Sequence, residues 1–95
     1  SCRLMLEIIL PSHLGFSEIS DYLKTTSERI DSASSVQLNF RDVQRINTIL
    51  VAFLVCVINQ VDEKRISLKL LGVTKELFSY IDDSELEKKI KTFCS

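Results

Sequence analysis

The sequence predicts a small α/β domain with a sheet of three to four mostly parallel strands and about four helices. Three short apolar stretches alternate with segments of helical spacing, and two further helical segments follow the last stretch. Strands that alternate with helices are joined by right-handed crossovers and form a largely parallel sheet. The chain has 95 residues, 45% hydrophobic and 26% charged, so residues 1–95 are predicted to form a single domain.

The first strand is predicted over residues 3–10 and the first helix up to about Ile30. Residues 3–10 read RLMLEIIL, and Pro11 ends the stretch. The alternation is weak, so we expect both faces of this strand to be buried. Ser17 is a candidate N-cap for the helix. The apolar face of the helix is predicted to consist of Phe16, Ile19, Leu23 and Ile30.

A half-buried strand and a capped helix are predicted in the middle of the chain. Residues 36–40 alternate between apolar and polar side chains, which is the pattern of a strand with one buried face. Residues 41–46 form a predicted loop. Asn47 is a good N-cap, so Thr48 becomes the first residue of the following helix.

The helix that begins at Thr48 is predicted to end near Val61 and contains ten consecutive apolar residues, 49–58. A helix that is apolar on all sides must be covered on more than one side. One apolar stripe consists of Leu50, Leu54, Val57 and Val61, and the opposite stripe consists of Ile49, Ala52, Phe53 and Cys56. Only one stripe can face a small sheet, and periodicity does not select which. The other stripe either packs under neighbouring helices or faces a partner.

A third strand and two short helices complete the predicted domain. Residues 66–71 alternate as a strand, and Thr74 is a candidate cap for a third helix. Ser84 and Glu87 have the spacing of a capping box at the start of a fourth helix. One face of that helix is predicted to consist of Leu86, Ile90 and Phe93.

Charge and hydropathy argue against nucleic-acid and membrane-inserted classes. Twelve basic and thirteen acidic residues give a net charge of −1. Nucleic-acid-binding modules usually carry a basic excess or stripe, and neither is present here. The longest apolar run is far shorter than the 18 or so residues that a membrane-spanning helix requires.

The reactive side chains do not form a catalytic or metal-binding pattern. Cys2, Cys56 and Cys94 are spaced unlike zinc or redox motifs, so we expect no metal and no cofactor. Cys56 is predicted to be a small core residue, because it lies inside the apolar run. His13 is the only histidine and has no cluster of nucleophiles or carboxylates near it in the sequence. We therefore expect a protein that is not an enzyme and is located in the reducing cytoplasm.

Three segments resemble the STAS domain family, which includes bacterial anti-sigma factor antagonists. Residues 38–43 (LNFRDV) are similar to the family's strand end, residues 46–50 (INTIL) to its helix start, and residues 70–73 (LLGV) to its later strand end. This sequence has Asn47 where the family has an aspartate. Ile49 and Leu50 replace the family's second hydroxyl residue and glycine, which is closer to the stressosome scaffold branch than to the small antagonists.

The resemblance implies a non-catalytic protein-interaction module, with Thr48 as its phosphorylation candidate. A phosphate on the first residue of a helix would meet unpaired N–H groups and the positive end of the helix dipole. In the alternative interpretation, Thr48 only helps to cap the helix. The expected partner-binding residues are Arg45, Asn47, Thr48, Ile49, Ala52, Phe53 and Cys56.

The implied partners are proteins, not nucleic acid or membrane lipid. They are a kinase-like anti-sigma factor, a scaffold or a transporter subunit. Two alternatives stay open at this point. The chain could be a constitutive STAS subunit of a lipid or other transport complex with Thr48 unmodified, or a self-associating scaffold that forms homodimers.

Overall fold

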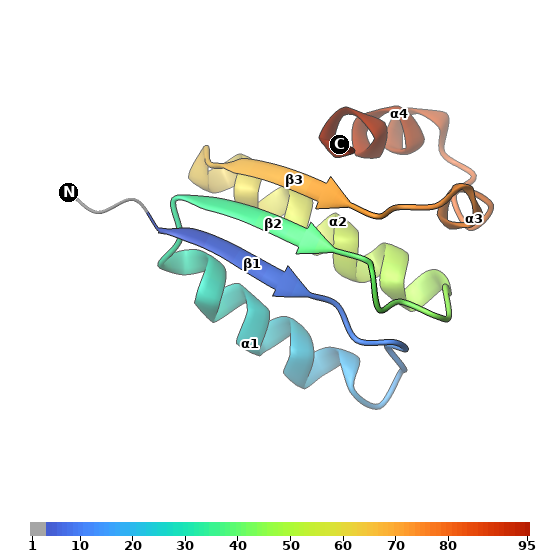
Figure 1. Cartoon of the computed structure of the whole chain (residues 1–95), viewed down its shortest axis with the longest axis horizontal. Helices are drawn as coiled ribbons and strands as arrows, with labels where there is room; N and C mark the ends of the chain where they lie inside the picture. Colours follow the sequence, from blue (N-terminus) through green and yellow to red (C-terminus); the bar gives the residue numbers. More distant parts are fainter. Residues whose placement is uncertain (1–3) are drawn as a thin grey trace.

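The computed structural model describes residues 4–95 and shows three parallel strands with four helices (Figure 1). The elements are β1 (Met5–Ile9), α1 (Ile19–Asp31), β2 (Ser35–Asn39), α2 (Thr48–Lys64), β3 (Ser67–Leu71), α3 (Lys75–Phe78) and α4 (Ser84–Phe93). The predicted α/β class and element order are confirmed. Arg3, the first residue of the predicted first strand, and Cys2 lie outside the described residues. Within residues 4–95, no helix has the length and apolar character needed to cross a membrane.

The two crossover helices lie on the same face of the sheet. The strands follow the order β1-β2-β3, all parallel. Two right-handed crossovers that advance in the same direction place both helices on one side, and Figure 1 shows α2 passing behind β3 and β2, with α1 below β1. The other face is open, with Met5 60% and Ile9 40% exposed. The expectation that both faces of β1 are buried is therefore wrong.

The long apolar run of α2 is covered by the sheet on one side and by α1 on another. The stripe that faces the core consists of Leu50, Leu54, Val57 and Val61. Phe53, from the opposite stripe, is also buried, because α1 places the Tyr22 ring 5.3 Å from its ring centroid. Within the apolar run, only Ala52 and Cys56 remain exposed. Most of the run is thus explained by packing within the domain.

The start of α1 differs from the predicted one. The helix begins at Ile19, and its N-cap is Glu18, whose side chain makes no capping hydrogen bond. The Gly15 carbonyl accepts hydrogen bonds from the N–H groups of Glu18 and Ile19, so a turn precedes the helix. Phe16 belongs to this turn and is 86% exposed, so its predicted place on the buried face of the helix is wrong.

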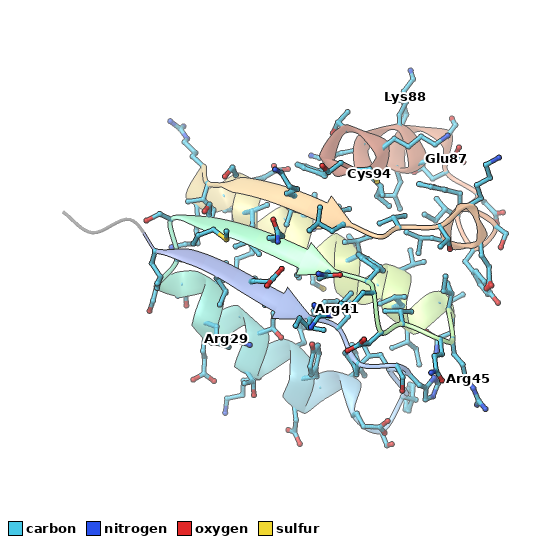
Figure 2. All side chains as sticks on the ribbon, in the orientation of Figure 1. Arg29, Arg41, Arg45, Glu87, Lys88 and Cys94 are labelled. Carbon is cyan, nitrogen blue, oxygen red and sulfur yellow. The ribbon has the colours of Figure 1, made fainter. Side chains whose placement is uncertain are left out.

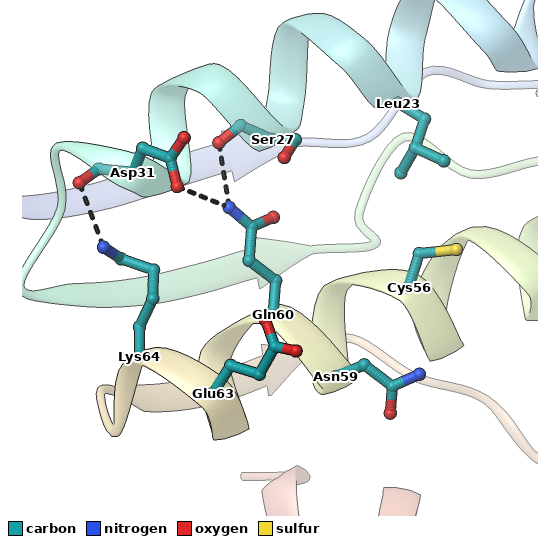
Figure 3. Close-up of a pocket in the computed structure, with 8 residues that line it drawn as sticks. All are labelled: Leu23, Ser27, Asp31, Cys56, Asn59, Gln60, Glu63 and Lys64. Carbon is teal, nitrogen blue, oxygen red and sulfur yellow. Dashed lines mark hydrogen bonds between the residues drawn. The ribbon is translucent and has the colours of Figure 1, made fainter.

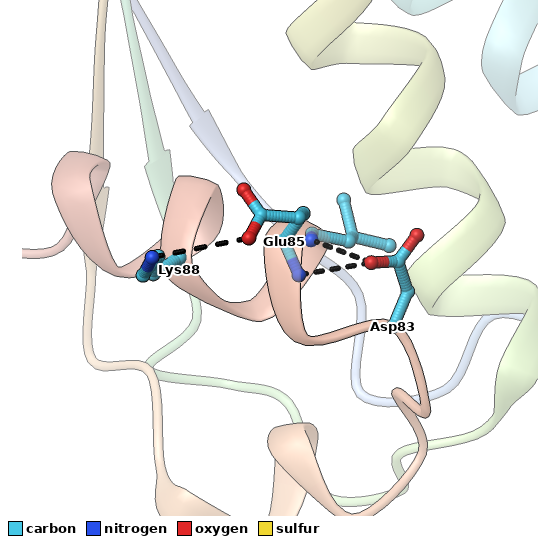
Figure 4. Close-up of polar contacts among 4 residues, drawn as sticks. Asp83, Glu85 and Lys88 are labelled. Carbon is cyan, nitrogen blue, oxygen red and sulfur yellow. Dashed lines mark hydrogen bonds and ion pairs between the residues drawn. The ribbon is translucent and has the colours of Figure 1, made fainter.

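The start of α4 differs by one residue. Asp83 is the N-cap, and its carboxylate accepts hydrogen bonds from the N–H groups of Glu85 and Leu86 (Figure 4). Ser84 is therefore the first helical residue and not the predicted cap. The Lys88–Glu85 ion pair nearby, at 3.8 Å, is highly exposed and contributes little to stability.

The two edges of the sheet differ in their surroundings. At the β3 edge, the Ser95 N–H donates to the Leu70 carbonyl at 3.1 Å, and Cys94 forms a parallel bridge with Leu70. Helix α4 follows this edge and buries Ile90 in the core. Within residues 4–95, no strand pairs with the outer edge of β1.

Candidate functional site

The start of α2 is held in place by Asn47. Its Oδ1 accepts a hydrogen bond from the Leu50 N–H at 2.9 Å, which confirms the predicted cap. Its Nδ2 donates to the Leu14 carbonyl at 3.0 Å and ties the helix to the loop after β1. An aspartate could provide the cap but not the donor. The two hydrogen bonds therefore explain why asparagine suits position 47 better than aspartate.

A second contact holds the loop before α2 against the loop after β1. The Ser12 carbonyl accepts hydrogen bonds from the N–H groups of Gln44 and Arg45 at 2.9 and 3.1 Å. Residues 41–46 form a loop, as predicted. The loops after β1 and β2 thus lie side by side and present the first turn of α2 in a defined orientation.

Thr48 is the first residue of α2 and its side chain is exposed. The side chain that caps the helix is that of Asn47, so the interpretation of Thr48 as a mere cap loses its structural basis. At the first turn of any helix, the N–H groups lack partners within the helix. A group bound to the Thr48 hydroxyl would lie at the positive end of a helix of 17 residues.

Two arginines lie in the loop of residues 41–46. Figure 2 shows Arg41 at the end of β2 and Arg45 near the start of α2. Both are exposed, and Arg41 lies 3.9 Å from the Asp42 carboxylate in a solvent-exposed pair. Such exposed charges contribute little to stability but influence which partners approach the surface.

The outward side of α2 contains most, but not all, of the predicted partner-binding residues. Thr48, Ala52 and Cys56 are exposed on one stripe, and Ile49 is half-buried beside them. Phe53 is only 1% exposed, so its prediction as a partner-binding residue is wrong. It turns inward because α1 supplies an aromatic neighbour. Conversely, the expectation that Cys56 is a core residue is wrong, since it faces outward.

A groove of about 480 Å³ between α1 and α2 continues from this stripe (Figure 3). At one end, Gln60 donates to the Ser27 carbonyl at 3.0 Å and to the Asp31 carboxylate at 3.1 Å. Lys64 donates to the Asp31 carbonyl at 3.1 Å. These bonds hold the two helices together and satisfy the polar groups at that end. Leu23 and Cys56 line the other end.

Phe16 is an exposed aromatic side chain whose exposure was not predicted from the sequence. It lies two residues beyond Leu14, whose carbonyl binds Asn47, and therefore close to the start of α2. An exposed phenylalanine is a suitable anchor for a protein partner. The sequence feature that indicated this exposure is the neighbouring Gly15, because glycine favours a turn over an early helix start.

The described residues contain no group of three or more histidine, cysteine, aspartate or glutamate side chains that could hold a metal ion.

Two side chains have raised pKa values. Burial raises the pKa of Tyr22, and the nearby Arg29 opposes the rise. Burial also raises the pKa of Cys94, and the nearby Lys91 opposes the rise. Neither side chain lies on the outward stripe of α2. These two side chains therefore provide no acid, base or nucleophile at the start of α2.

No model of a known protein family matches the chain, and no curated protein matches it either. A proposal for the function rests on the contacts at the start of α2 and on the resemblance of residues 38–43, 46–50 and 70–73.

Proposed function

We propose that the chain is a cytoplasmic protein-interaction module of STAS type whose partner docks on the start of α2. Phosphorylation of Thr48 sets the affinity, and the partner is a kinase-like anti-sigma factor or a related scaffold. The observation that carries this proposal is an exposed threonine hydroxyl at the first residue of a 17-residue helix that another side chain already caps.

A phosphate at Thr48 would change the charge of the surface without unfolding the helix. It would add about −1.5 to −2 charges. Because Asn47 provides the cap, the helix start does not depend on the Thr48 hydroxyl. The free N–H groups of the first turn and the positive end of the helix dipole stabilise the added charge. Arg45, exposed in the adjoining loop, provides further positive charge nearby.

The surface next to Thr48 is suited to an apolar contact. Ile49, Ala52 and Cys56 provide a small apolar stripe, and Phe16 provides a protruding aromatic ring. A partner that covers this stripe must remove water from the edge where Thr48 lies. A phosphate there would lose hydration on binding, so the phosphorylated form binds an apolar or acidic partner more weakly.

The test is a pull-down from the source cell's lysate with wild type, Thr48→Ala and Thr48→Asp as baits. Mass spectrometry identifies the prey and the modification state of the bait. We expect a kinase-like prey with wild type and Thr48→Ala, its loss with Thr48→Asp, and phosphate on Thr48. Thr92→Asp is the matched control, because it adds the same charge to exposed α4 and should retain the prey.

A second variant separates the binding surface from the switch. Ala52→Glu places a charge in the exposed stripe without disturbing the core, whereas a charge at buried Phe53 would unfold the protein. If Ala52→Glu loses the prey but Thr48→Asp keeps it, α2 is the interface and the proposed control of affinity by phosphorylation of Thr48 is wrong. If every bait retains one partner and Thr48 has no phosphate, a constitutive subunit is the better description.

A further inference from the structure

One complete face of the sheet has no covering layer among residues 4–95. It consists of Met5, Glu7 and Ile9 on β1, Ser35, Gln37 and Asn39 on β2, and Ser67, Lys69 and Leu71 on β3, here named the open sheet face. None of these residues is buried. All-parallel sheets occur almost only where both faces are covered. The open sheet face is therefore a candidate interaction surface, distinct from the helix layer that contains Thr48.

The charges of the open sheet face are arranged in one row. Glu7 on β1, Gln37 on β2 and Lys69 on β3 are in register across the three strands. Gln37 donates to the Glu7 carboxylate at 2.6 Å and so orients it along the row. The outer strands of such a trio lie about 10 Å apart, too far for an ion pair between Glu7 and Lys69 of one chain. The row thus has a negative end, a neutral centre and a positive end.

We propose that the open sheet face binds the same face of a second copy, around a two-fold axis that lies between the two sheets and runs approximately along β2. Rotation about this axis places β1 of each copy over β3 of the other. Glu7 then faces Lys69 of the second copy, twice in the dimer, and Ile9 faces Leu71. An axis perpendicular to the strands would instead place Glu7 over Glu7 and Lys69 over Lys69. Charge complementarity therefore selects both the occupant and the orientation.

The usual geometry of stacked sheets accommodates this dimer. Stacked sheets pack about 10 Å apart with their strands crossing at about −30°. This angle displaces the ends of the central row by only about 3 Å, within the reach of Glu7 and Lys69 side chains. Both helix layers lie outside the stack, so Thr48 stays accessible in each copy. The dimer and the partner surface at α2 are therefore independent.

The size of the face determines how the dimer must be tested. Three strands of five residues span an area of roughly 240 Å² per copy. Stable complexes bury about 800 Å² per partner. The association is accordingly weak, and it must be measured at protein concentrations from micromolar to millimolar.

Sedimentation equilibrium of the purified chain over this range, with charge-reversal variants, tests the proposal. We expect a concentration-dependent dimer for wild type, and association at least about tenfold weaker for Glu7→Lys and Lys69→Glu, because each opposes like charges. The reciprocal double variant and an equimolar mixture of the two single variants should both associate as wild type does. Lys88→Glu on exposed α4 is the matched control and should not change association.

Three outcomes would overturn the proposal. Wild type could remain monomeric at millimolar concentration. Lys69→Glu could associate as wild type does while Glu7→Lys does not, which would indicate pairing through the free edge of β1. The double variant could fail to associate. Thermal unfolding of each variant by circular dichroism establishes that it is folded, and the exposed positions of Glu7 and Lys69 make this the expected result.

Discussion

At the scale of single residues, Asn47 does two tasks that its common replacements cannot both perform. Asn47→Ala removes the acceptor for the Leu50 N–H and the donor to the Leu14 carbonyl. We expect the free energy of unfolding to fall by about 1–2 kcal/mol, mainly through the lost cap. Urea unfolding measures this. Asn47→Asp keeps the acceptor and should lose less; a loss as large as that of alanine would show that the Leu14 bond matters more.

Phe53 in α2 and Phe16 in the turn before α1 should respond to truncation to alanine by very different amounts. Phe53→Ala leaves a cavity beside Tyr22 and should cost about 3–5 kcal/mol in the free energy of unfolding. Phe16→Ala removes an exposed ring and should change stability by less than about 0.5 kcal/mol. Thermal and urea unfolding check both. A large loss with Phe16→Ala would mean that this ring packs against the domain and is not a free anchor.

At this scale, the sequence predicted the residues that act through local hydrogen bonds. Asn47 as cap and Thr48 as first helical residue follow from side-chain chemistry over a few positions. The burial of Phe53 and the exposure of Phe16 do not, because both depend on where α1 starts and how it packs against α2. Local chemistry thus predicted the start of α2, whereas the exposure of the two aromatic rings near it depends on the packing of α1.

At the scale of elements, the end of α2 contains a residue in an unfavourable conformation. Arg65 has φ 56° in the left-handed region, and the Ile66 N–H bonds the Val61 carbonyl at 3.1 Å in a Schellman arrangement. Glycine adopts this conformation without a Cβ penalty. Arg65→Gly should therefore raise the free energy of unfolding by roughly 0.5–1 kcal/mol.

The neighbouring position provides the control for this prediction. Lys64 is the last residue inside α2, where glycine costs about 1 kcal/mol relative to a good helix former. Lys64→Gly should therefore destabilise the protein while Arg65→Gly stabilises it, as measured by urea unfolding. A destabilising Arg65→Gly would mean that the arginine side chain contributes more than its backbone conformation costs.

The contact between α1 and α2 predicts a dependence of stability on alkaline pH. Burial raises the pKa of the Tyr22 phenol above its usual value of about 10, although Arg29 opposes the rise. A pKa that is higher in the folded state stabilises the protein below the unfolded pKa. This contribution is lost as the pH rises through the folded pKa. The free energy of unfolding should therefore fall above about pH 10.

Two conservative variants isolate this effect. Tyr22→Phe removes the ionisable group and should flatten the decline above about pH 10, whereas Tyr80→Phe, at an exposed position, should leave it unchanged. Urea unfolding at several alkaline pH values measures both. An identical decline in wild type and Tyr22→Phe would show that other groups cause it.

The elements themselves were predicted well, because each depends on a local pattern. Alternating strands and helices, and the break before Thr48, agree with the structure to within a few residues. The orientation of α2 could not be predicted, since two of its stripes are apolar and only the packing of α1 distinguishes them. The cap of α4 was misplaced because Asp83 and Ser84 are both good caps and adjacent.

At the scale of the whole molecule, topology determines what local patterns cannot. The apolar residues of β1 suggested a strand buried on both faces. Because both crossovers advance in the same direction, α1 and α2 cover one face and leave Met5 and Ile9 on the other. A two-layer domain thus has two separate surfaces. One is the outward side of the helix layer with Thr48, and the other is the open sheet face.

This separation leads to a prediction for the molecule as a whole. Changes at sites that are far apart and share no neighbours are usually additive. Thr48→Asp should therefore leave self-association unchanged in sedimentation experiments, and Lys69→Glu should capture the partner of α2 as wild type does. The double variant should lose both properties together. If Lys69→Glu weakened partner capture while remaining fully folded, the partner would bind the dimer or contact the sheet, and the two surfaces would form one site.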